Sequence, residues 1–194
     1  KISSIQASLM LSLLIVVQAS TSPQIFISYA RGEASQRAMV LKYMLEDEGF
    51  ICFLDVEDII TGKAWKPELR AALDSCEVLI ALVNQKFAES THDYGCLAEV
   101  EHVKRRGKPV MPVLLDDYRI QADSELNELM EKDDEGTIPY QRWRGTRNNE
   151  VTLLNRLRDH IQEGCHIVPQ NMPRAPGMCR CLYVRVRVCA CVRV

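Results

Sequence analysis

Two short apolar runs limit the folds that this chain can adopt. The runs Phe50–Leu54 and Val78–Val83 contain no polar side chain. Strands that are buried on both faces of a parallel sheet have this unbroken apolar pattern. A segment with helical periodicity lies between the two runs, and parallel neighbours need a crossover of this kind. The sequence therefore favours an α/β fold, with helices on both faces of a parallel sheet.

The same alternation of strand and helix continues along the chain. Further strands are predicted at Gln24–Tyr29, at Val110–Leu115 and, more weakly, at Thr137–Trp143. Helices are predicted at Ala34–Glu48, Pro67–Ser75, Cys96–Arg106 and Ser124–Asp134. A last helix is predicted to begin at a cap formed by Asn149, with Val151, Leu154, Leu157 and Ile161 on its apolar face. We expect a flavodoxin-like five-stranded parallel sheet in the order 2-1-3-4-5. Pro112 cannot donate to a ladder, which predicts an edge position for its strand.

Both ends of the chain differ in composition from the middle. Residues 2–23 carry no charge, and 9–17 are almost wholly apolar, a run shorter than the roughly twenty residues of a bilayer span. Three interpretations stay open for residues 1–21: a secretory leader, the end of a membrane segment, or a non-native flank. Residues 165–194 form a low-complexity tail rich in Cys, Val and Arg. We therefore predict one domain, at residues 22–164.

The charge distribution argues against nucleic acid as a partner. All 26 Asp and Glu residues lie within residues 22–164, together with 18 of the 24 Lys and Arg residues. Nucleic-acid binding needs a basic face, whereas this part of the chain is acidic. Contact with a membrane is expected only if the N-terminal apolar run is a native segment.

Cysteine usage indicates a reducing compartment. Cys52, Cys76 and Cys96 are scattered among core-like residues, as single buried thiols usually are, and no disulfide framework is evident. The tail contains Cys-x-Cys pairs, but zinc sites favour Cys-x₂-Cys, and no suitable histidine pair accompanies them. We expect a cytoplasmic protein without a bound metal, while the N-terminal run leaves a secretory or membrane-tethered form open.

Polar side chains follow the predicted strands at the edge where open α/β sheets bind ligands. The loop Asp55–Lys63 is acidic and closes with Gly62-Lys63. Glu99 lies in the first turn of a predicted helix, at the same edge. A glutamate at this place also has a purely structural explanation, because the helix dipole favours a carboxylate there. The sequence contains no dinucleotide-binding, P-loop or G-x-S-x-G motif.

Several motifs together resemble the Toll/interleukin-1 receptor (TIR) domain. Phe26–Tyr29 matches the opening strand of that family, and Cys96–Glu99 is similar to the Cys-x-x-Glu that opens its third helix. Phe53–Asp58, closing with Gly62-Lys63, looks like the second strand and the following BB loop. Gly107–Val113 resembles the fourth strand. The joint order and spacing of these motifs cover most of the predicted domain.

The acidic loop looks closest to the NAD-cleaving TIR branch, which includes the axon-degeneration hydrolase and plant and bacterial TIR proteins. This resemblance implies that Glu99 is catalytic and that NAD⁺ is a substrate, cleaved to nicotinamide and ADP-ribose products, with no cofactor. It implies substrate binding by Tyr29, Arg31, Asp55, Lys63, Trp65 and Tyr94. It also implies association with itself or other TIR domains through the BB loop, formed by Asp55, Val56, Glu57, Asp58, Ile59, Ile60, Thr61, Gly62 and Lys63.

One position departs from the pattern of the hydrolases. These proteins commonly carry an aromatic residue, often Trp, four residues before the glutamate, where this chain has Gly95. Tyr94 and Trp65 are the alternative sources of a stacking surface. Two functions therefore stay open: a self-associating NAD⁺ glycohydrolase, or a non-catalytic TIR adaptor acting in innate-immune signal transduction by homotypic interaction. Glu99 and the acidic loop favour the enzyme, and Gly95 favours the adaptor.

Overall fold

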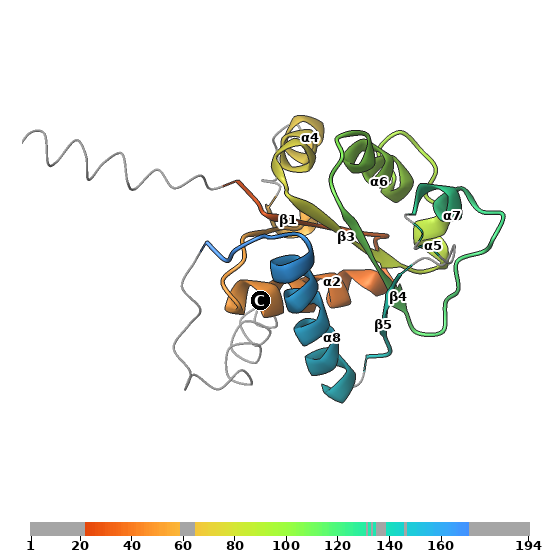
Figure 1. Cartoon of the computed structure of the whole chain (residues 1–194). Coiled ribbons are helices and arrows are strands. Elements are labelled where there is room, and N and C mark those ends of the chain that lie inside the picture. The colour runs from red at the N-terminus through yellow and green to blue at the C-terminus, as the bar shows by residue number, and fades with distance from the viewer. Residues whose placement is uncertain are drawn as a thin grey trace, which may run out of the picture.

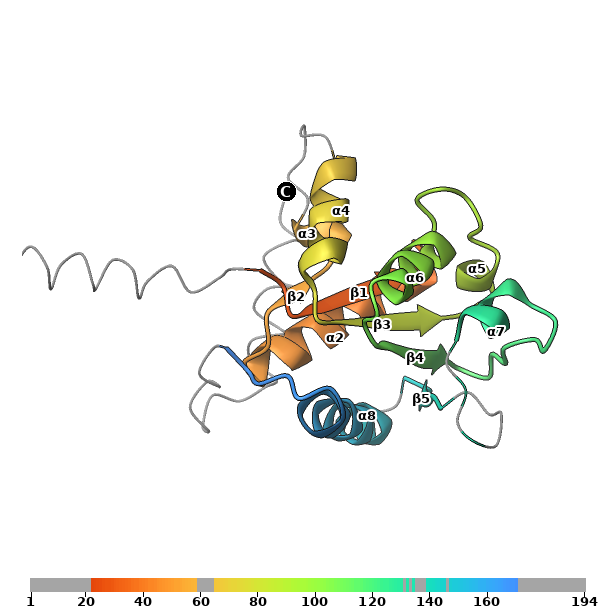
Figure 2. The ribbon, with the colours of Figure 1, turned by 45° about the horizontal axis from the view of Figure 1, so that its top comes forward.

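The computed structural model of this chain contains one five-stranded parallel sheet. The structure describes residues 22–58, 65–130, 132, 134, 139–145 and 147–170. The strands are β1 (Ile25–Tyr29), β2 (Cys52–Phe53), β3 (Val78–Val83), β4 (Val110–Leu115) and β5 (Gln141–Trp143). All pairs are parallel and the order is β2-β1-β3-β4-β5, which confirms the predicted fold (Figure 2).

Helices cover both faces of this sheet. On one face lie α2 (Glu33–Asp47), α8 (Arg147–Asp159) and the wider turn η1 (His160–Gly164) that continues α8. On the other face lie α4 (Trp65–Ser75) and α6 (Cys96–Arg105) (Figure 1). The short helices α3 (Asp55–Asp58), α5 (Gln85–Ala88) and α7 (Glu125–Leu129) lie in the connections. Among the residues described, no helix is both long and apolar enough to span a bilayer.

The central strand β3 contributes to the core on both faces. All six of its residues are fully buried, which explains the unbroken apolar run in the sequence. Alternate residues enter the two cores, Val78, Ile80 and Leu82 with α2 and α8, and Leu79, Ala81 and Val83 with α4 and α6.

The second strand is shorter than the predicted Phe50–Leu54. Only Cys52 and Phe53 pair with β1, and β2 is an edge strand. Gln24 replaces part of the ladder, because its side-chain oxygen accepts a hydrogen bond from the N–H of Ile51 at 3.2 Å. Its backbone N–H donates to the carbonyl oxygen of Ile51 at 2.8 Å. The run is still buried at both ends, and its apolar character therefore reflects burial more than pairing.

The prediction that Pro112 marks an edge strand is wrong, because β4 pairs with both β3 and β5. The N–H of Leu79 donates to the carbonyl oxygen of Pro109, so residue 109 faces β3. Successive residues of a strand face opposite neighbours, which turns the backbone of Pro112 toward the β5 side. The ladder with β5 begins only at Val113. An interior strand thus accepts a proline where no ladder hydrogen bond is needed.

Two helices depart from their predicted bounds. Helix α7 ends at Leu129 instead of Asp134, because Met130 takes an extended conformation and is buried. Acidic residues crowd the sequence beyond it, and like charges one turn apart disfavour a helix. Helix α8 begins at Arg147, so Asn149 lies inside it and accepts a hydrogen bond from the N–H of Arg144. Val151, predicted to face the core, is exposed.

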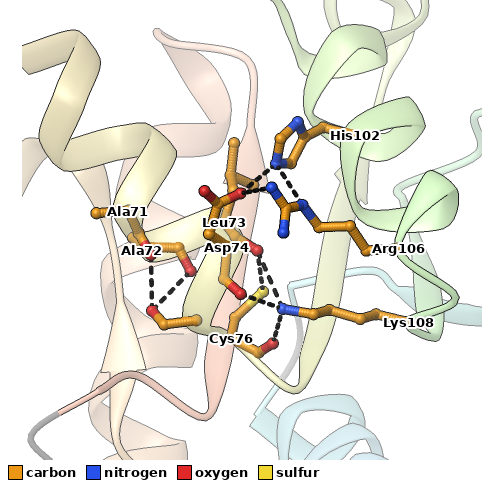
Figure 3. Close-up of polar contacts among 9 residues, drawn as sticks. Ala71, Ala72, Leu73, Asp74, Cys76, His102, Arg106 and Lys108 are labelled. Carbon is orange, nitrogen blue, oxygen red and sulfur yellow. Dashed lines mark hydrogen bonds and ion pairs between the residues drawn. The ribbon is translucent and has the colours of Figure 1, made fainter.

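A lysine from the segment before β4 holds the C-terminal end of α4 (Figure 3). Lys108 Nζ donates to the carbonyl oxygens of Leu73, Asp74 and Cys76 at 3.3, 2.6 and 2.5 Å. The last carbonyl groups of a helix have no partner within the helix, and a cation is favoured there by the helix dipole. Lys108 therefore fixes α4 against the start of β4.

We expect Lys108→Met to lower the free energy of unfolding by about 1–3 kcal/mol, because the carbonyl groups at the end of α4 lose a charged donor. Urea unfolding followed by circular dichroism measures this change. Arg105→Met is the matched control, since Arg105 pairs with Glu101 on an exposed helix surface, and such pairs contribute about 0–1 kcal/mol. Equal losses for the two variants would contradict the role given to Lys108.

Candidate active site

Glu99 meets the carboxyl end of β1. It lies in the first turn of α6, and the crossover after β3 brings the N-terminal end of α6 to this edge of the sheet. The hydroxyl of Ser28, on β1, donates to Glu99 Oε2 at 2.5 Å. Ser28 is almost fully buried and Glu99 is partly buried. The hydrogen bond therefore holds one carboxylate oxygen of Glu99 against the sheet.

The surroundings of Glu99 favour its protonated form. Burial raises the pKa of Glu99 to about 8, and the hydrogen bond from Ser28 opposes this rise. The nearby Asp55 carboxylate raises the pKa further, whereas the Arg31 guanidinium lowers it. A cation placed against Glu99 would favour the ionised carboxylate, because an opposite charge stabilises the charged form.

A second polar group lies beside Glu99, at the ends of β1 and β2. Arg31 Nη2 donates to Asp55 Oδ2 at 2.8 Å, and Arg31 Nε donates to the same oxygen at 3.3 Å. The Tyr29 hydroxyl and the second oxygen of Asp55, Oδ1, are buried and have no partner within hydrogen-bonding geometry. Burial, and then the neighbouring Asp55, raise the pKa of the Tyr29 hydroxyl above its usual range, so it remains a donor.

Two aromatic residues lie together on the surface at the N-terminal ends of α4 and α6. The rings of Trp65 and Tyr94 meet edge to face, with centroids 5.3 Å apart and an interplanar angle of 74°. Lys66 Nζ lies 4.3 Å from the centroid of the Tyr94 ring. Trp65 is 43% exposed and Tyr94 is 39% exposed. Both aromatic residues are therefore available to a ligand ring.

A cleft between α4 and α6 is lined by both Tyr94 and Glu99, and Trp65 contacts the Tyr94 ring. The cleft has a cavity volume of about 50 Å³, and it opens to solvent. Its lining comes from α4 (Lys66, Leu69, Arg70 and Leu73), from the loop before α6 (Asp93 and Tyr94) and from α6 (Ala98, Glu99 and His102). Glu99 is therefore accessible from outside although most of its surroundings are protein.

His102, which lines this cleft, forms an ionic cluster with Asp74 and Arg106 (Figure 3). His102 Nε2, on α6, lies 2.6 Å from Asp74 Oδ1, on α4. Arg106 Nη2 lies 2.7 Å from the same oxygen. The hydrogen bond with His102 is the main factor that lowers the pKa of Asp74, and the charge of Arg106 adds to it. These contacts join the two walls of the cleft and fix their spacing.

Comparison with known families identifies the chain. The sequence profile of the TIR domain matches residues 25–157, which include all five strands, the acidic loop and Glu99. The chain belongs to the TIR domain family. This match confirms the predicted TIR resemblance. Domains of this family act in signal transduction and commonly associate with one another.

Solved structures with a similar fold also contain TIR domains. The TIR domain of the Toll-related receptor TRR-2 from Hydra magnipapillata shares 18% identity, with a TM-score of 0.49, over 71% of this chain and 97% of that chain. A metazoan TIR-STING receptor from C. gigas in complex with 2′,3′-cGAMP shares 17% identity, with a TM-score of 0.44, over 66% and 38%. The TIR domains of the activated Roq1 resistosome, which recognises the effector XopQ, share 13% identity, with a TM-score of 0.45, over 88% and 99%.

The described site residues that were predicted for this TIR domain fall into two groups. Tyr29, Arg31 and Asp55 lie at the ends of β1 and β2. Tyr94 lines the cleft, and Trp65 contacts its ring. In the predicted association loop, Asp55, Val56, Glu57 and Asp58 form α3, whereas Ile59, Ile60, Thr61, Gly62 and Lys63 lie outside the described residues.

Ser28, the hydrogen-bond partner of Glu99, was not predicted from the sequence. The available signal was its polarity, since Ser28 interrupts the apolar pattern of a strand whose other residues are buried. The cluster of Asp74, His102 and Arg106 was missed as well. His102 and Arg106 are four residues apart on one helix, but nothing in the sequence indicated that Asp74 lies opposite them.

The geometry of the TIR domain explains why residue 95 is a glycine. A Cβ atom there would lie 2.4 Å from the carbonyl oxygen of Ser90 and 2.6 Å from its hydroxyl oxygen. The φ angle of Gly95 is −86°, which any residue adopts, so the close contacts are what exclude a side chain. The aromatic residue that the hydrolases carry at this position cannot be accommodated, and Tyr94 and Trp65 provide the aromatic surface nearby.

The three buried thiols are not activated for chemistry. Cys52, Cys76 and Cys96 are free and buried, as the sequence predicted. Burial raises the pKa of Cys96 to about 12, although Cys96 lies at the start of a helix. A thiol in this state is a poor nucleophile. Within the described ranges, no group of three or more His, Cys, Asp or Glu side chains is placed to hold a metal ion.

We expect Glu99→Gln to stabilise the protein at alkaline pH. The pKa of Glu99 is about 8 in the folded protein and about 4.3 in an unfolded chain. Between these values the folded state binds more protons, so the free energy of unfolding of the wild type falls as the pH rises. The variant avoids this loss. Urea unfolding at about pH 4 and about pH 8 measures the difference, which should be small at the lower pH and should favour the variant at the higher pH.

Glu101→Gln is the control for this experiment, because Glu101 lies on the same helix but on its exposed side. It should show no comparable gain at the higher pH. Unfolding free energies of Glu99→Gln and wild type that change in parallel with pH would contradict the raised pKa of Glu99.

Proposed function

We propose that this TIR domain hydrolyses NAD⁺ to nicotinamide and ADP-ribose products. The observation that carries the proposal is the position of Glu99, which is hydrogen-bonded to Ser28 and accessible from the cleft between α4 and α6. Glu99 also occupies the glutamate position of the Cys-x-x-Glu motif, and the family resemblance gives that glutamate contact with the nicotinamide riboside. Geometry and motif therefore support the same residue.

The chemistry of the reaction suits a partly buried carboxylate. Cleavage of the bond between ribose C1′ and the nicotinamide nitrogen leaves the electron pair on nicotinamide and builds positive charge on the sugar, as in glycoside hydrolysis. An ionised carboxylate stabilises this charge most strongly where little water screens it. Water then adds to C1′ and releases a proton. Since Ser28 holds Oε2 of Glu99, the other oxygen, Oε1, is the one that can face the ribose.

The groups around Glu99 suit a cationic, aromatic leaving group. The nicotinamide ring of NAD⁺ is positively charged, and its charge would favour the ionised form of Glu99 on binding. The exposed rings of Tyr94, which lines the cleft, and of Trp65, which contacts Tyr94, offer a stacking surface. Tyr29, Arg31, Asp55 and Lys63 are proposed to bind the substrate as well.

A non-catalytic adaptor is the second candidate function. Gly95 favours it, because the position that is commonly aromatic in the hydrolases excludes any side chain here. In both proposals the domain associates with itself or with other TIR domains through the loop from Asp55 to Lys63, and acts in the cytoplasm. The two functions differ only in whether NAD⁺ is turned over, which a direct assay decides.

Glu99→Ala and Glu99→Gln should each lower the rate of NAD⁺ cleavage roughly a hundred- to a thousandfold, because one electrostatic contact to the transition state is lost. Chromatography of released nicotinamide measures the rate. Glu101→Gln is the control and should keep the wild-type rate. Cleavage by both Glu99 variants at the wild-type rate would place the catalytic site elsewhere. A wild type that releases no nicotinamide, even at high protein concentration, would support the adaptor.

Ser28→Ala should move the pH dependence of kcat/KM to higher pH. The ionised form of Glu99 is the active one, so kcat/KM should rise with pH through the pKa of the free protein, which is about 8. The hydrogen bond from Ser28 lowers this pKa, and its loss should raise it. Initial rates at low NAD⁺ concentration measure the profile. A variant that is slower at every pH but keeps the wild-type midpoint would show that Ser28 does not set the ionisation of Glu99.

A further inference from the structure

A buried lysine on α2 is bound to the helix that follows β2. Lys42 is 5% exposed. Its Nζ donates to Asp58 Oδ1 at 2.6 Å and to Asp58 Oδ2 at 2.5 Å. Asp58 is the last residue of α3 and is less buried than Lys42. The pair therefore joins a long, firmly packed helix to the short helix at the edge of the candidate site.

Asp58 is also bound to the end of β2. The backbone N–H of Leu54 donates to Asp58 Oδ2 at 2.6 Å, and the N–H of Asp58 donates to the carbonyl oxygen of Leu54 at 2.9 Å. These two bonds close the segment Leu54–Asp58 into a ring. Lys42 connects this ring to α2, which packs on the sheet through Ala34, Ala38, Leu41 and Leu45.

The Asp55 carboxylate extends from the same ring. Helix α3 has four residues, and one turn of helix does not hold its shape without outside contacts. The contacts of Asp58 therefore decide how this turn is oriented. Asp55 in turn accepts two hydrogen bonds from Arg31, and both residues influence the ionisation of Glu99.

We propose that Lys42 is a positioning residue, which fixes α3 through Asp58 and thereby holds Asp55 against Arg31 beside Glu99. A structural role alone explains the buried Lys42 poorly, since an apolar residue of similar size often stabilises a core as well as a buried charge or better. Lys42 Nζ contacts both carboxylate oxygens of Asp58, which restrains the position of that carboxylate. The catalytic consequence of this inference rests on the proposed function, whereas the connection between Lys42 and Asp55 does not.

Glu46 provides a matched control. Its carboxylate lies 3.7 Å from Lys42 Nζ, one turn further along the same helix. Glu46→Gln removes an acidic neighbour of Lys42 that lies on α2 itself. A general effect of disturbing the charges around Lys42 should appear in both Lys42→Met and Glu46→Gln. A positioning effect should appear only in Lys42→Met and in Asp58→Asn.

The first measurement is amide hydrogen exchange on the full chain. In Lys42→Met, the amides of Leu54 and Asp58 should exchange at least about tenfold faster, because their ring is no longer held to α2. Amides of β3 should be unchanged. The Arg31 Nε–H signal in nuclear magnetic resonance spectra should shift as well, since this group donates to Asp55. Glu46→Gln should leave all three signals as in the wild type.

The second measurement is NAD⁺ cleavage. Lys42→Met should lower kcat/KM roughly tenfold to a hundredfold, as expected for a site group displaced by about 1 Å. Glu46→Gln should stay within about twofold of wild type. The double variant Lys42→Met/Asp58→Asn should lose no more than the stronger single variant, because residues that act through one contact are not additive.

The outcomes separate this inference from the proposed function. Unchanged exchange at Leu54 and Asp58, or an unchanged Arg31 signal, overturns the positioning role whether or not the protein is an enzyme. A wild type that releases no nicotinamide overturns the proposed function, and the exchange and Arg31 signals still decide the role of Lys42. In an active wild type, altered signals with unchanged kcat/KM also overturn the inference. If Lys42→Met fails to fold, Asp58→Asn is measured in its place, because the Asp58 side chain is more exposed than that of Lys42.

Discussion

Parallel pairing of β1 with β2 and β3 decides where the polar residues of the site meet. In a parallel sheet all strands end at the same edge, so the segments after Tyr29 and Phe53 lie side by side. The crossover that parallel neighbours require returns each helix with its N-terminal end at this edge. Glu99 reaches Ser28 for this reason, although 71 positions separate them in the sequence. The location of the site is therefore determined by the strand order and the direction of the strands.

The fold was predictable because the strands are buried and the helices have one apolar face. Burial makes β3 uniformly apolar, and the sequence shows this directly. The bounds of the edge elements were less predictable. Gln24 replaces part of the ladder at β2, and Met130 ends α7 by turning into the core. Both effects depend on residues whose partners lie elsewhere in the chain, so local propensity does not reveal them.

The positions of the site residues were partly predictable. Motif order pointed to Glu99 and Asp55, since each follows a recognisable strand or opens a helix. The contacts of Ser28 with Glu99 and of Lys42 with Asp58 were not predictable, because folding alone brings these residues together. Lys42 in particular lies within an ordinary amphipathic pattern, where a lysine is normally expected to be exposed. A buried charge of this kind becomes visible only once its partner has been placed.

The crowding around Gly95 has a consequence for comparing this domain with its relatives. Sequences of one family are often aligned column by column, as if a residue could be exchanged between members at a given position. Here the turn from Ser90 to His92 fills the space that a side chain would need. Transfer of an aromatic residue into this column would require that turn to be rebuilt as a unit. Residue 95 should therefore be compared between relatives only together with the turn from Ser90 to His92. In this chain the aromatic side chains nearby are Tyr94 and Trp65, which lie outside that alignment column.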